Sequence, residues 1–476
     1  MNSLSNQKLT LIRYGDEMAS SRDDFIQKNL YYYQDLLSFL SYNIPDQSTV
    51  LEIGCGTGYL LNALNPRKGV GIDLSPKMIE LARAKYPHLH FYQMDAEDIQ
   101  LEETFDVIII SDTLGYFEDI QKVFSEIKKV ATPDTRIILT YHSFLWQPVL
   151  KLAEYFKLKM PQQRLNWLND QDVANLLRLE NFEIIKRGRR FLCPKYVPGL
   201  SQLFNKYLAN LPLVNALCIT EYTIARIRHE APFDNELYSV SVIIPARNEK
   251  GNIENAVKRI PKMGKNVEII FVEGHSTDGT LDEIKRVCEA YRDHVDMHYA
   301  VQDGRGKGDA VRKGFTMATG DILMILDADL TMPPEELPKF YNAIATGKGE
   351  FINGCRLVYP MENEAMRFLN MLGNKFFSTM FSFLLGQRLK DTLCGTKVIS
   401  RENYAKLARN RDYFGEFDPF GDFDLIFGAS KLNLQIVELP IRYRSREYGK
   451  TNISRFSHGW LLLKMVLFAM HKIKFN

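Results

Sequence analysis

Short apolar runs alternate with glycine-containing turns and amphipathic stretches along this chain, in two successive series. The first series begins at residues 50–53 and the second at residues 240–244. Apolar runs of this length, bounded by turn residues and followed by helical patterns, are typical of the buried strands of parallel sheets. The pattern therefore predicts an α/β fold with two tandem α/β domains.

A polar segment at residues 228–238, broken by Pro232, separates the two series. Since domain boundaries fall in such segments, we expect a first domain over 1–234 and a second over 235–476. The first would have its core at about 25–140 and an extension at 141–230. The amphipathic pattern of 197–215, in that extension, could form core, an acceptor face or a membrane face, and core is favoured.

Composition and charge narrow the class of protein. The chain is 45% hydrophobic and 25% charged, with a net charge of +2, which gives no reason to expect nucleic-acid binding. Its six cysteines are scattered, with no C-x-x-C pair, so a disulfide framework or zinc site is not expected and a reducing compartment is favoured. We expect neither a signal peptide nor a membrane-spanning helix, and hence a cytoplasmic location.

The first series opens with "VLEIGCGTGYLL", which reads as strand, glycine turn and helix. A dinucleotide fingerprint would have its third glycine at position 59, where this chain has Tyr59, so NAD binding is disfavoured. Later strands end at Asp73, at Asp95 and at Ser111–Asp112. Because the carboxyl ends of parallel strands meet at one edge, these side chains should form one ligand site.

The segments "LEIGCGTG", "GIDLSPKMIELA", "MDAED" and "FDVIIISDTLGYFED" resemble the class I S-adenosylmethionine-dependent methyltransferases, over about residues 25–140. The resemblance implies a Rossmann-like domain whose glycine loop faces the amino acid part of the cofactor. It also implies that Asp73 holds the ribose and Asp95 the adenine amine. The cofactor-binding set is then Glu52, Gly54, Gly56, Gly58, Asp73, Asp95, Ala96, Ser111 and Asp112.

The methyl acceptor is less well defined by the sequence. Many relatives have a histidine where this chain has Gly115-Tyr116, so no general base is identified there. Asp112, Tyr116 and the pair Tyr141/His142 are possible pocket residues, although for His142 a plain polar strand-end residue is favoured. The tyrosines at 31–33 could close over the cofactor or simply pack. A domain that binds the cofactor, or serves as a scaffold, without turnover is the alternative.

The second series carries two nucleotide-type turns and a basic glycine-rich loop. The turns "PARNE" and "VEGHSTDGT" supply Pro245, Ala246, Asn248, Glu249, Glu273, Ser276 and Asp278. In the loop "GRGKGDA", Lys307 is followed by glycine, which excludes a Walker motif but still allows the lysine to approach a phosphate. These turns predict binding of a nucleotide.

The stretch "GDILMILDAD" ends a buried strand with Asp327 and Asp329 on one face. Two adjacent carboxylates repel each other, so a divalent cation such as Mg²⁺ or Mn²⁺ is expected between them and a substrate diphosphate. The alternative is that the aspartates cap the helix predicted at "TMPPEEL".

Residues 238–456 resemble the inverting family 2 glycosyltransferases of the GT-A fold, and most closely the polyprenyl-phosphate (dolichyl-phosphate type) transferases. The resemblance implies that the two turns, Lys307 and the "DAD" residues (Asp327, Ala328, Asp329) bind a nucleotide-sugar. "KDTLCGTKVISR" then supplies Asp391 as base or positioning acid, beside Asp329. "FGDFDLIF" offers Asp422 and Asp424 as further catalytic candidates.

Residues 441–476 contain eight Lys or Arg residues and one acid, Glu447. An ionised phosphate acceptor needs positive charge rather than a base, and we expect Arg356, Arg444, Arg446 and Lys450 to bind it. Alternatively the acceptor is a saccharide or soluble hydroxyl, and the basic run is solvated surface.

Two basic amphipathic stretches, 374–390 and 458–476, could lie on a membrane surface or pack as core helices. Together these features predict a bifunctional methyltransferase and glycosyltransferase, peripheral at the cytoplasmic face of a membrane, with a polyprenyl-phosphate acceptor.

Overall fold

The computed structural model describes residues 5–161, 166, 168–229, 232, 234, 236–358, 368–409, 422–446, 448 and 463–474. The chain divides into two compact units, Met1–Arg228 and His229–Lys474. Each contains one seven-stranded sheet with helices, so the prediction of two α/β domains is confirmed. The boundary expected near residue 235 lies in a stretch that is only partly described, and it stays a prediction.

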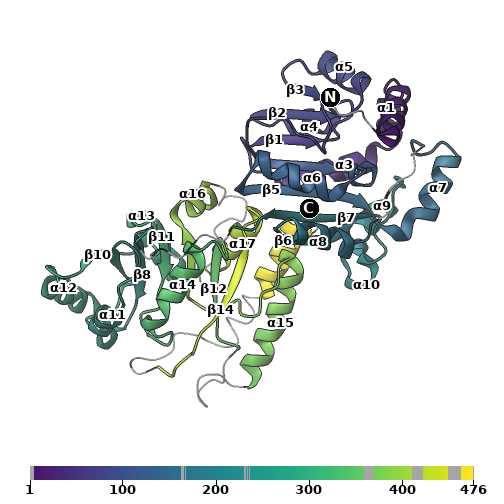
Figure 1. Ribbon diagram of the computed structural model, residues 1–476. Coiled ribbons are helices and arrows are strands. Elements are labelled where there is room, and N and C mark those ends of the chain that lie inside the picture. Colours follow the sequence, from purple (N-terminus) through teal and green to yellow (C-terminus); the bar gives the residue numbers. More distant parts are fainter. Residues whose placement is uncertain are drawn as a thin grey trace. The chain divides into compact units, whose positions relative to one another are not determined.

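The sheet of the first unit has the strand order β3-β2-β1-β4-β5-β7-β6 (Figure 1). Strand β7 runs antiparallel to both of its neighbours, and the other pairs are parallel. The strands are β1 Thr49–Ile53, β2 Lys68–Asp73, β3 His90–Gln93, β4 Phe105–Ser111, β5 Ala131–His142, β6 Phe182–Arg190 and β7 Thr220–Ile227.

Helices cover both faces of this sheet, because successive side chains of a strand point to opposite sides. Val50 packs with residues of α3, α4 and α5, while Leu51 packs with residues of α6 and α8. The helices are α1 Asn6–Met18, α2 Arg22–Lys28, α3 Leu30–Asn43, α4 Tyr59–Leu64, α5 Pro76–Lys85, α6 Ile120–Ile127, α7 Gln147–Tyr155, α8 Asp170–Leu179, α9 Leu200–Gln202 and α10 Pro212–Asn215.

The sheet of the second unit has the order β10-β9-β8-β11-β13-β12-β14, with β13 antiparallel to its neighbours. Its first four strands in this order are all parallel, so their carboxyl ends share one edge. The strands are β8 Val240–Ala246, β9 Val267–Glu273, β10 Asp296–Val301, β11 Ile322–Ile325, β12 Phe351–Cys355, β13 Lys397–Ser400 and β14 Ile436–Pro440.

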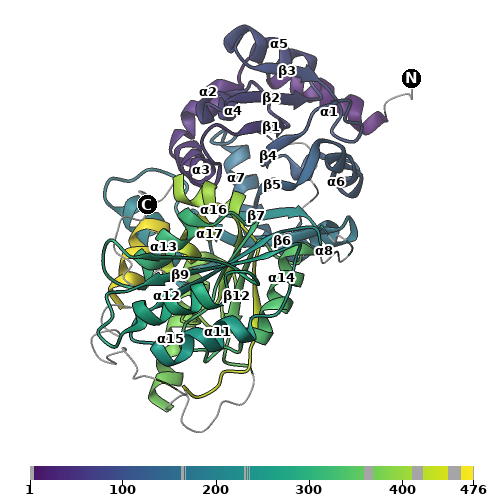
Figure 2. The same ribbon diagram turned by 90° about the vertical axis from the view of Figure 1, so that its left-hand side faces the viewer.

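Two apolar clusters lie on the two faces of this second sheet. The helices that contribute to them are labelled in Figure 2. One cluster includes α11 Ile253–Arg259, α12 Thr280–Ala290 and α14 Leu337–Ala345. The other includes α13 Lys307–Met317, α15 Phe368–Leu385, α16 Arg401–Arg409 and α17 Asp422–Lys431.

The two stretches expected to be either membrane-facing or core both contribute to this core. Phe381 and Leu384 of α15 are buried in it, as are Met465 and Val466 of the segment 463–474. Phe376 and Leu467 point outward and are 52% and 56% exposed. Among the described residues, no helix is long and apolar enough to cross a membrane.

The prediction that 197–215 is mainly core was wrong. Leu200, Leu203, Tyr207, Leu211 and Leu213 are all exposed. Residues 200–210 are helical but change from α to π to 3₁₀ geometry every three to five residues, and the four-residue helix α10 follows at Pro212. Such short turns cannot present one continuous apolar face to the sheet, and most of their leucines therefore point outward.

Candidate functional sites

A cavity of about 370 Å³ lies at the carboxyl ends of the parallel strands of the first unit. Of the predicted cofactor residues, Gly54, Gly56, Asp73, Asp95, Ala96, Ser111 and Asp112 line it. Glu52 is buried within β1, and Gly58 is the N-cap of α4 with a φ of 78°. Neither of these two lines the cavity.

Asp73 is fixed by backbone donors at the end of β2. Its Oδ2 accepts from the amide of Gly56 at 2.9 Å, and its Oδ1 accepts from the amide of Ser75 at 2.9 Å. Burial raises the pKa of Asp73. Gly54 has a φ of 78°, and a Cβ there would collide with Thr113, so this turn requires glycine. The carboxylate is thus held beside the glycine loop.

Sequence reasoning missed Arg22, at the start of α2. Its side chain lines the cavity, and its Nε lies 3.6 Å from where a Cβ on Gly56 would sit. A guanidinium beside a glycine loop suits a carboxylate ligand. No motif marks this arginine, which comes from a helix before the first strand.

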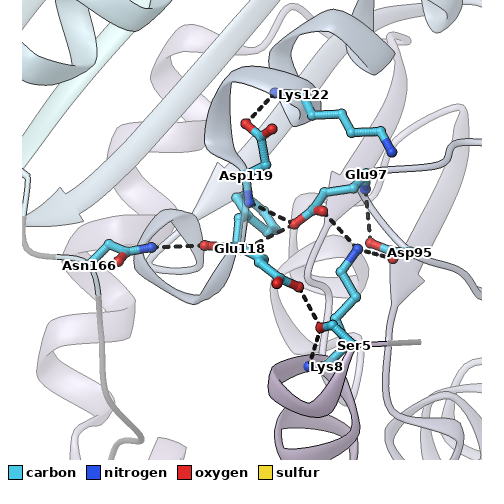
Figure 3. A network of polar contacts seen from close by, with 9 residues as sticks. Ser5, Lys8, Asp95, Glu97, Glu118, Asp119, Lys122 and Asn166 are labelled. Carbon is cyan, nitrogen blue, oxygen red and sulfur yellow. Dashed lines mark hydrogen bonds and ion pairs between the residues drawn. The ribbon is translucent and has the colours of Figure 1, made fainter. Parts of the chain in front are cut away.

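A polar network ties α1 to the ends of β3 and β4 (Figure 3). Lys8 Nζ donates to Asp95 at 2.6 Å and to Glu97 at 2.7 Å. Burial alone would lower the pKa of Lys8, but the two carboxylates raise it. The hydroxyl of Ser5 donates to Glu118 at 2.6 Å. Helix α1 thereby closes one side of the cavity.

At the ends of β4 and β5, three side chains meet. Tyr32 donates its hydroxyl to Asp112 Oδ2 at 2.6 Å, and His142 Nδ1 lies 3.9 Å from Asp112 Oδ1. Asp112 has a φ of 52°, an unusual conformation for a residue other than glycine. His142, Tyr116, Tyr32 and Tyr33 line the cavity, whereas Tyr141 does not.

These residues fit S-adenosylmethionine. Its carboxylate, ribose diol and adenine amine need a cation, a carboxylate and a further acceptor in that order along the sheet edge. Arg22, Asp73 and Asp95 line the cavity and supply these three groups.

In the second unit, the two nucleotide-type turns interlock. The Asn248 amide donates to Ser276 Oγ at 2.9 Å, and Asn248 Oδ1 accepts from the Thr277 amide at 2.8 Å. The Ser276 amide in turn donates to Glu273 at 2.5 Å. Asn248 and His275 both have a φ of 57°. The predicted nucleotide residues therefore form one connected loop pair.

The remaining residues of these turns lie beside that pair. Asp278 accepts from the amides of Lys250 at 3.3 Å and Thr280 at 3.0 Å. Pro245 and Ala246 end β8, where the Ala246 carbonyl accepts from the Gly274 amide at 2.9 Å.

Each aspartate of the "DAD" stretch is paired with a basic side chain. Lys307 Nζ lies 2.5 Å from Asp327 Oδ1, and Arg446 donates to Asp329 at 2.7 Å. Burial opposes ionisation of Asp327, yet Lys307 holds its pKa below the usual range. A Cβ at Gly395 would collide with the Asp327 carboxylate, so the predicted acceptor-side stretch lies against this strand end.

The helix-cap alternative for these aspartates is not what the chain adopts. Asp329 Oδ1 accepts from the amide and hydroxyl of Thr331, at 3.1 and 2.8 Å. The following helical turn starts at Pro334 with Pro333 in its N-cap position. Leu330, between Asp329 and Thr331, has a φ of 53°.

Asp391 is fully buried and bound to Arg356. Its oxygens accept from Arg356 Nε at 2.7 Å, from Nη2 at 2.8 Å and from the Arg356 amide at 2.9 Å. Burial would raise the pKa of Asp391, but Arg356 holds it low. The carboxylate is closed to an acceptor hydroxyl, so of the two roles expected for it, positioning is favoured.

The remaining predicted residues of the second unit are Asp422, Asp424, Arg444 and Lys450. Asp424 is buried on α17, beside Gly308 and Arg312 of α13. Arg444 has an exposed side chain, and its amide donates to the Thr331 carbonyl at 2.9 Å. Lys450 and the side chain of Asp422 lie outside the described residues.

Within the described part of the chain, one group of three side chains could hold a metal: Glu268, Asp296 and His298. Glu268 and Asp296 are near the beginning of β9 and β10, at the sheet edge opposite the "DAD" stretch. Glu268 already accepts from Ser241 and from the Thr319 amide.

Comparison with known families assigns each unit a class. Residues 25–187 match the family described as methyltransferase domain, and residues 241–408 match glycosyl transferase family 2. The chain therefore carries a methyltransferase domain followed by a family 2 glycosyltransferase domain, as the sequence predicted.

Particular relatives match about half of this chain. A dolichol-phosphate mannosyltransferase of Pyrococcus furiosus is 38% identical over 237 residues, which are 47% of this chain and 64% of the relative. The low-salt glycan biosynthesis hexosyltransferase Agl6 of Haloferax volcanii is 28% identical over 233 residues, 48% of this chain. The chain spans 53% of the length of Agl6.

Among solved structures, a Haloferax volcanii putative methyltransferase in complex with the activator Trm112 is 15% identical, with a TM-score of 0.37. The match covers 47% of this chain and 99% of that chain.

Proposed function

We propose that this protein is bifunctional. The second unit transfers a sugar from a nucleotide-sugar to a polyprenyl-phosphate acceptor with inversion, and the first transfers a methyl group from S-adenosylmethionine. The observation that carries the glycosyltransferase assignment is Arg446, which donates to Glu249 at 2.8 Å and to Asp329 at 2.7 Å. It joins the first nucleotide turn to the carboxylates at the end of β11.

Asp327 and Asp329 would hold Mg²⁺ or Mn²⁺. When bound, such an ion neutralises charge on a diphosphate leaving group. Two carboxylates on one strand end, beside the basic loop of Lys307, fit this role. In the structure the side chains of Lys307 and Arg446 balance the negative charge of the two aspartates. We therefore propose that these two cations contact the donor phosphates, which for Arg446 replaces the acceptor-phosphate role expected from the sequence.

A phosphate acceptor is favoured over a hydroxyl acceptor. A hydroxyl acceptor needs an open base, and the Asp391 carboxylate is closed by Arg356. Arg356 is oriented by that pair and by the ring of Tyr443, 5.3 Å from its guanidinium carbon. Its guanidinium and the exposed Arg444 are suited to a phosphate. Transfer to a saccharide hydroxyl is the second candidate, and it would need a base other than the buried Asp391 and Asp424.

In the first unit, Arg22 and the glycine loop would bind the amino acid part of S-adenosylmethionine, Asp73 the ribose and Asp95 the adenine. The cofactor supplies an electrophilic methyl group when bound. The chain's residues orient it in a cavity whose wall includes the apolar side chains of Leu11, Trp146 and Leu150. We place the protein at the cytoplasmic face of a membrane, where a polyprenyl phosphate would be met.

The test of the glycosyltransferase assignment is a transfer assay with the purified full chain. Mg²⁺ or Mn²⁺, a panel of radiolabelled nucleotide-sugars and a polyprenyl phosphate are mixed, and label in the organic phase is counted. Metal-dependent label there supports the proposal. A labelled water-soluble product instead would favour the hydroxyl acceptor.

The first unit is tested separately by calorimetry. We expect S-adenosylmethionine and S-adenosylhomocysteine to bind, and Asp73→Ala to abolish binding. Absence of binding to the wild-type chain would refute the methyltransferase assignment.

A further inference from the structure

Two buried polar atoms in the methyltransferase cavity have no hydrogen-bond partner: Asp112 Oδ1 and His142 Nδ1. Other unpartnered atoms occur in the described residues, on Glu52, Thr220 and Glu221 among others, but their residues do not line the cavity. Leaving such a group unpaired costs about 1–3 kcal/mol, and folded proteins do so rarely. Because both residues line one cavity, the pair indicates a site for a ligand group.

The distance between these two atoms limits how a ligand group can bind to them. At 3.9 Å they are too far apart to bond to each other. A hydroxyl group has a single proton, which it can donate to His142 Nδ1, and Asp112 Oδ1 then lies beside the imidazole ring that receives this proton. Tyr32 holds the other oxygen of Asp112 at 2.6 Å, and its ring meets that of His142 edge-on at 5.9 Å. The pair is therefore held in place without a ligand.

The charges around the pair select a neutral ligand group. Asp112 would repel a carboxylate. Lys159 and Arg22 line the same cavity and would oppose an ammonium group. Trp146, Leu150 and other apolar side chains form the adjoining wall. A hydroxyl group attached to an apolar body satisfies all of these conditions.

We infer that Asp112 and His142 form the acceptor end of the methyltransferase site, that the acceptor presents a hydroxyl group, and that His142 is the base. This inference rests on the proposed binding of S-adenosylmethionine. The acceptor oxygen forms a bond to the methyl carbon while the carbon–sulfur bond breaks. The bonding electron pair goes to sulfur, giving S-adenosylhomocysteine, and the hydroxyl proton goes to His142 Nδ1.

The surroundings suit that proton transfer. Burial lowers the pKa of His142, so its imidazole is neutral and able to accept a proton near neutral pH. Asp112 opposes this shift and would stabilise the imidazolium. Glu154 and Lys159, which act on the same ring with opposite sign, lie 3.1 Å from each other. Asp112 is thus the charge that favours protonated His142.

The test uses the full chain, S-adenosylmethionine labelled in its methyl group, and four probes with the same alkyl chain: 4-octylphenol, octyl glucoside, octylamine and octanoic acid. We expect the labelled methyl group to be transferred to a hydroxyl probe, 4-octylphenol or octyl glucoside, as an ether that alkali does not cleave. Label in octanoic acid that alkali releases as methanol, or label in octylamine alone, would overturn the inference.

The base is tested with His142→Asn, which keeps a polar atom near Nδ1 but cannot accept the proton. We expect kcat to fall at least about 100-fold and the acid limb of the pH profile to disappear. Binding of S-adenosylhomocysteine should stay within about twofold. His88→Asn, at an exposed position, is the matched control. A kcat within about threefold of the wild type refutes the base.

A binding measurement covers the case in which no probe is methylated. In the complex with S-adenosylhomocysteine, 4-octylphenol should shift the Nδ1 resonance of ¹⁵N-labelled His142. No methylation together with no shift would overturn the inference. If the chain binds no S-adenosylhomocysteine at all, the proposed function itself has failed.

A second, independent observation concerns the outer surface of the first unit. Large apolar side chains are exposed on two segments, 144–158 and 196–217. They are Phe144, Leu145, Val149, Leu152, Tyr155, Phe156, Leu158, Tyr196, Val197, Leu200, Leu203, Tyr207, Leu211, Leu213 and Leu217. The segments meet where Trp146 Nε1 donates to the Leu217 carbonyl at 2.8 Å. We call these residues the apolar rim.

The charges of the apolar rim indicate its partner. Lys151, Lys157, Lys195 and Lys206 are exposed among its apolar residues. The one acid within the two segments, Glu154, is paired with Lys159 at 3.1 Å. Apolar and aromatic side chains interspersed with lysines are suited to an anionic lipid surface. Val149 and Leu158 of the rim also line the cavity.

The structure therefore assigns the apolar rim to a lipid surface of negative charge. The full chain should float with vesicles containing an anionic phospholipid, less so at high salt. Leu152→Glu combined with Leu213→Glu should abolish this, whereas Phe376→Glu combined with Leu467→Glu, on the second unit, should not. No flotation of the wild type at low salt, or equal flotation of the rim variant, overturns the assignment. Concentration-dependent dimers that only the rim variant loses would assign the surface to self-association instead.

Discussion

Arg356 and Asp391 are joined by two side-chain hydrogen bonds of 2.7 and 2.8 Å, and the carboxylate is fully buried. A planar guanidinium matches a carboxylate in this two-point geometry, which an ammonium group cannot reproduce. The same two hydrogen bonds therefore stabilise the fold of the second unit and orient Arg356, which we propose binds the acceptor phosphate.

Arg356→Lys keeps the charge and loses the two-point geometry. We expect the free energy of unfolding to fall by about 1–3 kcal/mol and transfer to polyprenyl phosphate to fall at least about tenfold. Urea unfolding and the organic-phase assay measure the two effects. Arg444→Lys, with its exposed side chain, should unfold like the wild type. A variant at 356 with unchanged unfolding and transfer would contradict this role.

Asp327→Asn tests the metal assignment. The substitution removes the charge that Lys307 and a metal would share, so we expect metal-dependent transfer to fall by about 100-fold with the circular dichroism spectrum retained. The control is Asp296→Asn, in the group of Glu268, Asp296 and His298 at the opposite sheet edge. If the control loses metal dependence and Asp327→Asn does not, the ion binds between β9 and β10 instead.

Lys8→Met tests the closure of the cofactor cavity by α1. Methionine keeps much of the side-chain volume but loses both ion pairs, to Asp95 and Glu97. We expect the Kd for S-adenosylmethionine, measured by calorimetry, to rise by about three- to tenfold. Lys68→Met removes an exposed ion pair with Glu103 and should leave the Kd unchanged. Unchanged affinity in the Lys8 variant would mean that α1 is not needed for binding.

Glu52→Gln tests a pH dependence of stability. Burial raises the pKa of Glu52 to about 8, from an ordinary value of 4.5. Between these values the folded chain keeps a proton that the unfolded chain has released. The free energy of unfolding therefore falls as pH rises through this window, and the loss is complete above the folded pKa.

Glutamine has no proton to lose, so the variant should be more stable than the wild type at about pH 8.5, by a few kcal/mol, and similar at about pH 4. Urea unfolding at the two pH values measures this. Glu103→Gln, at the surface, should show no such difference between the two pH values. Equal stability of wild type and Glu52→Gln at high pH would show that Glu52 is not a buried neutral acid.

Local patterns were enough to predict the two sheets and most strand-end residues. Gly54, Gly56, Asp73 and Asp95 could be placed because each directly follows an apolar strand, and parallel strands bring their ends together. The same rule explains why Asn248 and Ser276 are adjacent, although 28 residues separate them.

Contacts contributed from outside these strand ends could not be predicted. Arg22 and Lys8 come from helices that precede the first strand, and their positions depend on how those helices pack. Arg446 reaches Glu249 across 197 residues of sequence. The exposure of Leu213 was missed for another reason: apolar content alone does not distinguish a core segment from a surface that meets another phase.

Non-glycine residues with positive φ follow the ends of strands in both units: Asp112 after β4, Asn248 after β8 and His275 after β9. Such conformations cost of order 1 kcal/mol each and persist only where the surroundings enforce them. Glycine at the exposed His275 would relieve that cost, yet it would also free the turn that carries Ser276. Selection of this protein for heat resistance should therefore enrich substitutions at these positions that raise its thermal stability and lower its turnover rate together.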